Sequence, residues 1–212
     1  LELVKNNIKI LQISATPSNS LVDASEWEDH HERLSPNVDS GYVSFDRFLE
    51  EERVFTPYFL SNIDETEKYI EHVAQGRPMY HFVRSVCNGM TGSMVYLETQ
   101  VNFEIICTEK KYELIELNMG MERKDVKKVY KNLSKSPERH TFILIKNMLG
   151  ASKTLDDTFI GSVHESTPMK KDYSSEVQGL PGRLCGWTKR KGHEGPNIFC
   201  ERSILGSYID LY

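Results

Sequence analysis

The sequence has few cysteines, no long apolar run and no histidine pair at metal-ligand spacing. Its four cysteines form no C-x-x-C pair and show no regular spacing, which excludes a zinc ribbon and a disulfide framework. None of its seven histidines has the spacing of a metal ligand, so no metal site is expected. No stretch approaches the roughly 18 consecutive apolar residues of a membrane span. The lack of such a run excludes a membrane protein. The lack of a G-x-S-x-G elbow argues against serine hydrolase chemistry.

The composition does provide a core. Of the 212 residues, 39% are hydrophobic and 10% aromatic, which is enough apolar surface to form a hydrophobic core. The length allows one full domain plus a fragment, or two small domains. The N-terminus has no initiator Met, no basic region and no apolar leader, so it indicates a cut end. With no disulfide framework expected, the thiols favour a reduced, intracellular and soluble protein.

The net charge of −5 conceals a polarity along the chain. Residues 21–75 carry 14 acids against 4 Lys and Arg, whereas residues 121–153 carry 9 Lys and Arg against 3 acids. A local basic segment can bind a polyphosphate by neutralising phosphates and releasing counterions. The polarity favours a nucleic-acid or nucleotide partner, although a solvated basic helix would explain the segment equally well.

Hydrophobic patterning predicts an alternation of strands and helices. From residue 79 on, this alternation predicts a parallel sheet with helices on both faces and a ligand at the carboxyl ends of the strands. The expected strands are 8–13, 79–85, 103–108 (104–107 at its narrowest), 141–146, 159–164 and 197–201. The expected helices are 46–52, 63–75, 91–101, 125–134 and 174–178. The remainder of residues 20–60 is acidic and irregular, as in a surface connector.

Three segments carry side chains suited to chemistry. The first is Ser14-Ala15-Thr16, at the end of the strand 8–13, where hydroxyls can bond a neighbouring carboxylate and transmit small movements. On this motif alone, a hydroxyl-rich turn before Pro17 is the simpler interpretation.

The second segment follows the strand 141–146 and contains Lys146, Lys153 and Thr154. It invites comparison with the phosphate-binding loop G-x-x-x-x-G-K-[ST], but Asn147 and Ser152 occupy the two glycine positions. What remains is a strand-to-helix turn whose lysines and backbone N–H groups could contact phosphate oxygens. An ordinary surface turn is the alternative.

The third segment, 178–187, begins with Gln178 and contains Gly182-Arg183. A glycine directly before an arginine lets the backbone approach a partner while the guanidinium reaches outward. Stabilising phosphate charge during NTP hydrolysis requires this arrangement. Gln178 could contact polar groups in the same cleft, whereas the alternative interpretation is a Gly/Pro turn with a surface arginine.

Taken in order, these segments resemble the carboxyl half of a superfamily 2 (DEAD/DEAH-like) helicase. Their sequence around His140 and Gln178 is most similar to helicase-like proteins of large DNA viruses and phages. Residues 10–17 resemble motif III, 78–85 the motif IV strand, 140–165 motif V and its following strand, and 177–187 motif VI. Two departures stand out. Gly182 lies four residues after Gln178 rather than three, and Gly186 occupies the position of the second arginine.

The resemblance implies a role for each matching residue. Arg183 would be the arginine finger toward the γ-phosphate, with Gly182 beside the nucleotide and Gln178 on the same cleft face. Lys146, Lys153 and Thr154 would border the nucleic acid, and Ser14 and Thr16 would couple hydrolysis to domain movement. ATP and Mg²⁺ would be bound mainly by an N-terminal RecA-like lobe, because the sequence contains no G-K-[ST] and no Asp-Glu pair of motif II upstream.

The resulting hypothesis is an α/β chain in three parts: residues 1–19 end a first RecA-like domain, 20–77 form an acidic connector, and 78–212 form a second RecA-like domain. It would be the C-terminal portion of an ATP-dependent helicase or translocase, acting on DNA rather than RNA, and would not hydrolyse ATP alone. A viral source would place it in the host cytoplasm or the virion. The alternatives are a catalytically silent RecA-like module that binds nucleic acid or a protein, and a small-molecule α/β enzyme.

Overall fold

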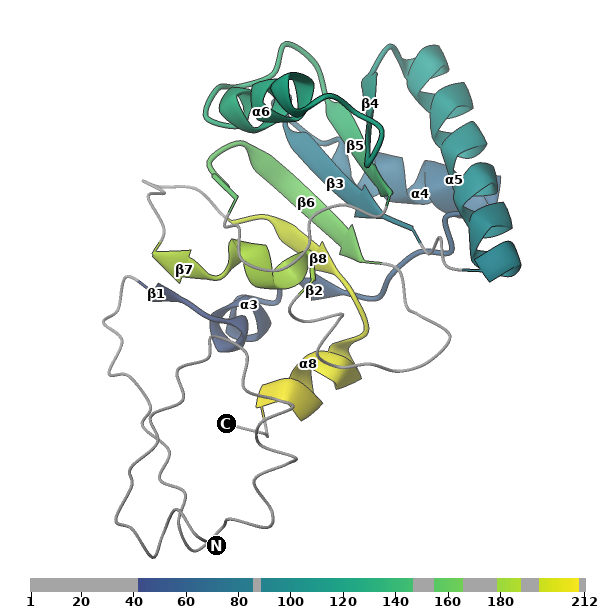
Figure 1. Ribbon diagram of the computed structural model, residues 1–212. Helices are drawn as coiled ribbons and strands as arrows, with labels where there is room; N and C mark the ends of the chain where they lie inside the picture. The colour runs from purple at the N-terminus through teal and green to yellow at the C-terminus, as the bar shows by residue number, and fades with distance from the viewer. Residues whose placement is uncertain (1–41, 86–88, 147–154, 166–178, 188–194, 210–212) are drawn as a thin grey trace, which may run out of the picture. The chain divides into compact units, whose positions relative to one another are not determined.

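The structure, a computed structural model, describes residues 42–85, 89–146, 155–165, 179–187 and 195–209. Its centre is a six-stranded parallel sheet in the order β2-β8-β6-β3-β5-β4 (Figure 1). The strands are β2 (Val54–Phe55), β3 (Tyr80–Arg84), β4 (Glu113–Asn118), β5 (Thr141–Lys146), β6 (Ile160–Glu165) and β8 (Asn197–Phe199). A second, two-stranded sheet pairs β1 (Tyr42–Val43) antiparallel with β7 (Gly186–Trp187).

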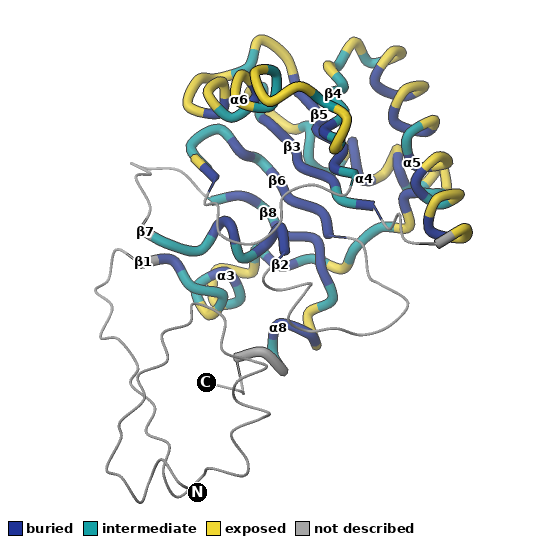
Figure 2. Tube along the Cα trace, in the orientation of Figure 1, coloured by how far each residue is buried: buried dark blue, intermediate teal, exposed yellow. Residues whose placement is uncertain are grey.

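Helices cover both faces of the six-stranded sheet. The helices are α3 (Phe45–Glu50), α4 (Ile63–Val73), α5 (Gly89–Lys110), α6 (Arg123–Asn132), the 3-10 turn η2 (Pro181–Leu184) and α8 (Arg202–Ile209). Side chains of α4 and α5 share one hydrophobic cluster with Phe142 and Leu144 of β5. Side chains of α3, α6, η2 and α8 share the other cluster with Ile143 and Ile145 of the same strand. The central strands are therefore apolar on both sides, and Figure 2 shows β3, β5 and β6 as predominantly buried.

The predicted α/β class is confirmed: the structure has a parallel sheet between two layers of helices, consistent with a RecA-like fold. Strand 141–146 was predicted to the residue. The predicted strands 79–85, 159–164 and 197–201 appear as β3, β6 and β8, and the predicted helices 46–52, 63–75 and 125–134 appear as α3, α4 and α6. Gly76, at φ 72°, closes the segment after α4 with a backbone conformation that favours glycine.

One predicted strand is wrong. Residues 103–108 lie inside α5, which continues the helix expected at 91–101 through to Lys110. The run from Phe103 to Cys107 is apolar because this helix is apolar on two faces: Phe103 points into the core and Ile105 outward. A short apolar run alone cannot distinguish a buried strand from such a helix. The strand at this place in the alternation is instead β4, the next element along the chain.

Residues 54–77, assigned above to a surface connector, belong to the α/β unit. Val54 and Phe55 pair with Ile198 and Phe199 of β8, and Tyr69 and Ile70 of α4 are fully buried. The compact unit therefore begins upstream of residue 78.

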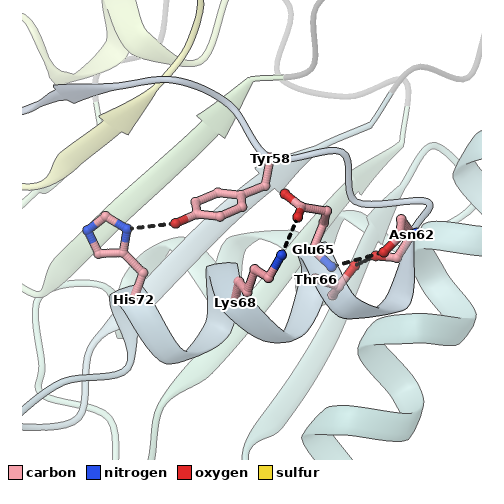
Figure 3. A network of polar contacts seen from close by, with 6 residues as sticks. All are labelled: Tyr58, Asn62, Glu65, Thr66, Lys68 and His72. Carbon is pink, nitrogen blue, oxygen red and sulfur yellow. Dashed lines mark hydrogen bonds and ion pairs between the residues drawn. The ribbon is translucent and has the colours of Figure 1, made fainter.

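Hydrogen bonds fix α4 and the segment before it (Figure 3). The side chain of Asn62 accepts a hydrogen bond from the backbone N–H of Glu65 at 3.1 Å, which caps the helix. Tyr58 contacts His72 Nδ1 through its hydroxyl at 3.1 Å, and its backbone N–H donates to His164 Nε2 at 3.0 Å. Because His164 belongs to β6, these bonds attach the segment to the sheet.

The strand expected at 8–13, the Ser-Ala-Thr turn, the upstream part of the connector and the helix expected at 174–178 lie outside the described residues. None of the helices in the described ranges combines the length and hydropathy that crossing a bilayer requires.

Candidate functional site

Charged residues gather at the carboxyl edge of the six-stranded sheet. Arg84 ends β3, Lys146 ends β5 and Glu165 ends β6. Arg84 lies opposite Glu165 in the β3–β6 pairing and opposite Ile145 in the β3–β5 pairing, so all three charges lie at one edge. In open parallel sheets this is the edge at which ligands bind.

Glu165 joins the strand ends to the glycine–arginine turn. Its carboxylate lies 3.1 Å from a guanidinium nitrogen of Arg84 and accepts a hydrogen bond from the backbone N–H of Leu180 at 2.9 Å. Glu165 is only 5% exposed, so both interactions are largely shielded from water. The carboxylate thereby fixes the segment that begins at Gly179 against the ends of β3 and β6.

Arg183 lies in η2 and is 4% exposed. Leu180 and Leu184, on either side of it, are core residues, and its backbone carbonyl accepts a hydrogen bond from the N–H of Leu155 at 3.2 Å. Burial is the largest cause that lowers the pKa of Arg183, and the nearby Arg84 cation lowers it further. Tyr130 of α6 and Glu165 raise it. The guanidinium therefore lies inside a cluster of charged and aromatic groups, not on the surface where a finger would be presented. Gly182, beside it, is half-buried.

Lys146 lies at the same edge but on the other face of the sheet. Its ammonium is 4.5 Å from the centroid of the Tyr96 ring of α5, a cation–π contact. Residues of β5 alternate between the two hydrophobic clusters, and Lys146 follows Ile145 of the α6 side. The sheet thus separates Lys146 from Arg183, and the structure does not bring these two predicted site residues together.

A basic surface covers the outer side of α6. Val129 and Leu133 point into the core, and the exposed side carries the cations of the predicted basic cluster. These residues are Arg123, Lys124, Lys127, Lys128, Lys131 and Lys135, the last just beyond the helix. We call them the α6 basic face. The amphipathic helix and its orientation were readable from the i, i+3, i+4, i+7 spacing of its apolar residues.

The other predicted site residues, Ser14, Thr16, Lys153, Thr154 and Gln178, lie outside the described residues. In the described ranges, no group of three or more His, Cys, Asp and Glu side chains could hold a metal ion. Glu165, which ends β6, is bound to Arg84. The described residues therefore do not fit a Mg²⁺–nucleotide site by themselves.

Sequence reasoning did not single out Arg84, Glu165, Tyr96 or the Leu180 amide. Glu165 follows the polar His164, so its neighbours in sequence give no signal. A signal existed for Arg84, which, like Lys146, directly follows buried apolar residues. A charge in that place marks the carboxyl edge of a parallel sheet. The aromatic contact and the backbone donor have no counterpart in sequence spacing.

A buried polar chain lies within the α4/α5 side of the sheet. Tyr69 contacts Ser162 at 3.0 Å, Ser162 contacts His81 Nδ1 at 2.9 Å, and His81 Nε2 contacts His140 Nδ1 at 3.0 Å. Burial lowers the pKa of His81 to about 3, with His140 acting in the same direction. This row of buried imidazoles and hydroxyls satisfies its own polar atoms within the core.

Comparisons with protein-family models, with curated proteins and with solved structures find no match for this chain.

Proposed function

We propose that this chain is the C-terminal portion of an ATP-dependent nucleic-acid helicase or translocase, acting on DNA rather than RNA. The observation that carries the proposal is the attachment of the Gly182–Arg183 turn to the carboxyl edge through Glu165 and Arg84. The parallel α/β sheet and the α6 basic face support it further, because they provide a ligand-binding edge and a surface for phosphates.

In this proposal, ATP binds between this lobe and an N-terminal RecA-like lobe, the two lobes close on the nucleic acid, and hydrolysis releases them. Arg183 contributes by reaching the phosphates that the other lobe binds. Because Arg183 is buried in this lobe, closure has to move η2 and expose the guanidinium. Glu165 and Arg84 would hold the turn in place until then.

The decisive experiment uses a protein that includes the N-terminal lobe. Arg183→Ala should lower kcat for ATP by about a hundredfold or more while ATP affinity changes little, since the interaction forms only in the transition state. Arg202→Ala, at an exposed arginine of α8, is the matched control and should leave both constants unchanged. Equal loss of turnover and affinity, or no loss, would argue against a finger.

The burial of Arg183 favours a second candidate, a catalytically silent RecA-like module that binds nucleic acid without turnover. Both candidates predict that the 212-residue chain binds single-stranded DNA and that binding weakens with salt. Replacing Lys124, Lys127 and Lys131 by Gln should make the plot of log K against log salt less steep, by about 0.7 for each phosphate that the variant no longer neutralises. Lys68→Gln, on α4, should not change the slope.

ATP turnover separates the candidates. An Arg183-dependent, DNA-stimulated ATPase in the protein with both lobes would support the motor, and DNA binding without any turnover would support the silent module. Turnover by the 212-residue chain alone, above a mock preparation, would contradict both.

A further inference from the structure

Helix α5 is apolar on two opposite faces. One face packs on the sheet and buries Tyr96, Phe103, Ile106 and Cys107. The other face points outward, and Figure 2 shows exposed positions recurring along the length of α5. Its large apolar side chains, Met90, Met94, Leu97, Val101 and Ile105, are between 50% and 84% exposed. We call these five residues the α5 stripe.

The α5 stripe has the spacing of a helix-binding surface. Its residues are separated by four, three, four and four positions, so they fall on one side of the helix. At 1.5 Å per residue the stripe is about 22 Å long, or roughly four turns. Single exposed apolar residues need no explanation, but a continuous exposed stripe marks an interaction site.

The charged residues that flank the stripe are acids. At 100° per residue, Glu98 and Glu109 project on one side of it and Glu104 on the other, where Gln100 donates a hydrogen bond to Glu104 at 2.9 Å. Lys110 is the one basic residue within α5. It lies on the inward side, with its ammonium 3.0 Å from Glu71 of α4, so its charge is already paired.

We propose that the α5 stripe binds an amphipathic helix of a partner protein, with an apolar face bordered by lysines or arginines. The apolar side chains would interdigitate as in a helix pair, and the partner's cations would meet Glu98, Glu104 and Glu109. One helix pair of this length falls below about 1,200 Å² of buried surface, so the complex is transient.

The acids on both sides of the α5 stripe favour a basic amphipathic helix over other binding partners. A second copy of the chain would bring glutamates against glutamates in either orientation, which is unfavourable. Helices that lie on membranes carry lysine and arginine beside the apolar face, whereas this stripe would be repelled by anionic headgroups. The acids equally disfavour a nucleic acid, so this surface is separate from the α6 basic face.

The test uses the complete chain and a fluorescein-labelled peptide of about three heptads, with Leu at a and d and Lys at e and g. Leu97→Gln should weaken binding by about tenfold or more, because a buried leucine side chain contributes that much. Met119→Gln is the control: Met119 is as exposed as the stripe but lies outside α5, so binding should be unchanged. Thermal unfolding should show that both variants keep the fold.

Charge reversal tests the borders separately. A second peptide with Glu at e and g should bind the native chain at least about tenfold more weakly. Replacing Glu98, Glu104 and Glu109 by Lys should reverse that preference. No binding of the lysine peptide, or equal binding by Leu97→Gln, would overturn the proposal. So would a dimer in sedimentation equilibrium, or binding to phosphatidylcholine–phosphatidylserine vesicles, that Leu97→Gln abolishes.

Discussion

The carboxylate of Glu165 lies 3.1 Å from the guanidinium of Arg84, and the two residues face each other at the ends of neighbouring parallel strands. Arg183 lies close enough that Arg84 lowers its pKa. Glu165 therefore acts on both arginines: it pairs with Arg84 and raises the pKa of Arg183.

Removing that acid should be costly. Glu165→Gln removes a carboxylate that is 5% exposed and binds both Arg84 and the Leu180 amide, and breaking a largely buried pair in this way destabilises a protein by roughly 3–5 kcal/mol. Glu71→Gln, which removes an exposed carboxylate from the pair with Lys110, should cost less than about 1 kcal/mol. Urea denaturation of both variants compares the two costs, and similar small losses would show that the Glu165 pair is not effectively buried.

The contribution of α4 to the core can be measured with one substitution on each side of the helix. Ile70 is fully buried, so Ile70→Ala should destabilise the protein by about 2–5 kcal/mol. Ile63, at the start of the same helix, is 43% exposed, and Ile63→Ala should cost clearly less. Equal effects in thermal or urea unfolding would restore the interpretation of residues 54–77 as a connector outside the core.

Gly161 is required by the histidine that packs over it. A Cβ added there would lie 2.8 Å from Cε1 of His81, whose ring is held by Ser162 and His140. Gly161→Ala should therefore destabilise by about 1–3 kcal/mol. At Gly206 in α8 a Cβ meets nothing within 4 Å, so Gly206→Ala should stabilise by about 0.5–1 kcal/mol. The same sign for both changes, measured by urea unfolding, would contradict this.

Stability should fall in mild acid. Burial lowers the pKa values of His81 and His164 to about 3, so below pH 6.5 the unfolded chain binds more protons than the folded one. Stability is therefore full above the unfolded pKa and decreases as the pH falls from 6.5 toward 3. Each histidine contributes up to about 1.4 kcal/mol per pH unit. Urea midpoints measured at pH 7, 6 and 5 test this, and a midpoint that does not fall over that range would contradict it.

How far the sequence predicts this fold depends on how local each signal is. α6 was predictable because its apolar residues follow the helical period, and β5 because its continuous apolar run has the length of a strand buried on both faces. The predicted helix 91–101 is shorter than α5 because α5 is apolar on both faces, which removes the helical period that distinguishes a helix from a strand. β2 was not predicted because its two residues form a strand only by pairing with β8, which is distant in sequence.

The candidate site divides in the same way. Lys146 and Arg183 could be singled out, since one follows an apolar strand and the other follows a glycine. The burial of Arg183 could not be predicted, because it depends on how η2 lies against the core and on the bonds that attach its turn to Glu165 and Arg84, both distant in sequence. Such contacts follow from the strand order, which no local spacing specifies.

The pairing of Val54 with Ile198 has a consequence for how the molecule is made. A chain emerging from the ribosome presents β2 long before its partner β8 has been synthesised, and β8 also has to reach β6. Contacts between such distant segments form late and fold slowly. A nascent chain would therefore carry an open hydrogen-bonding edge for most of its synthesis, which makes premature termination a direct route to aggregation.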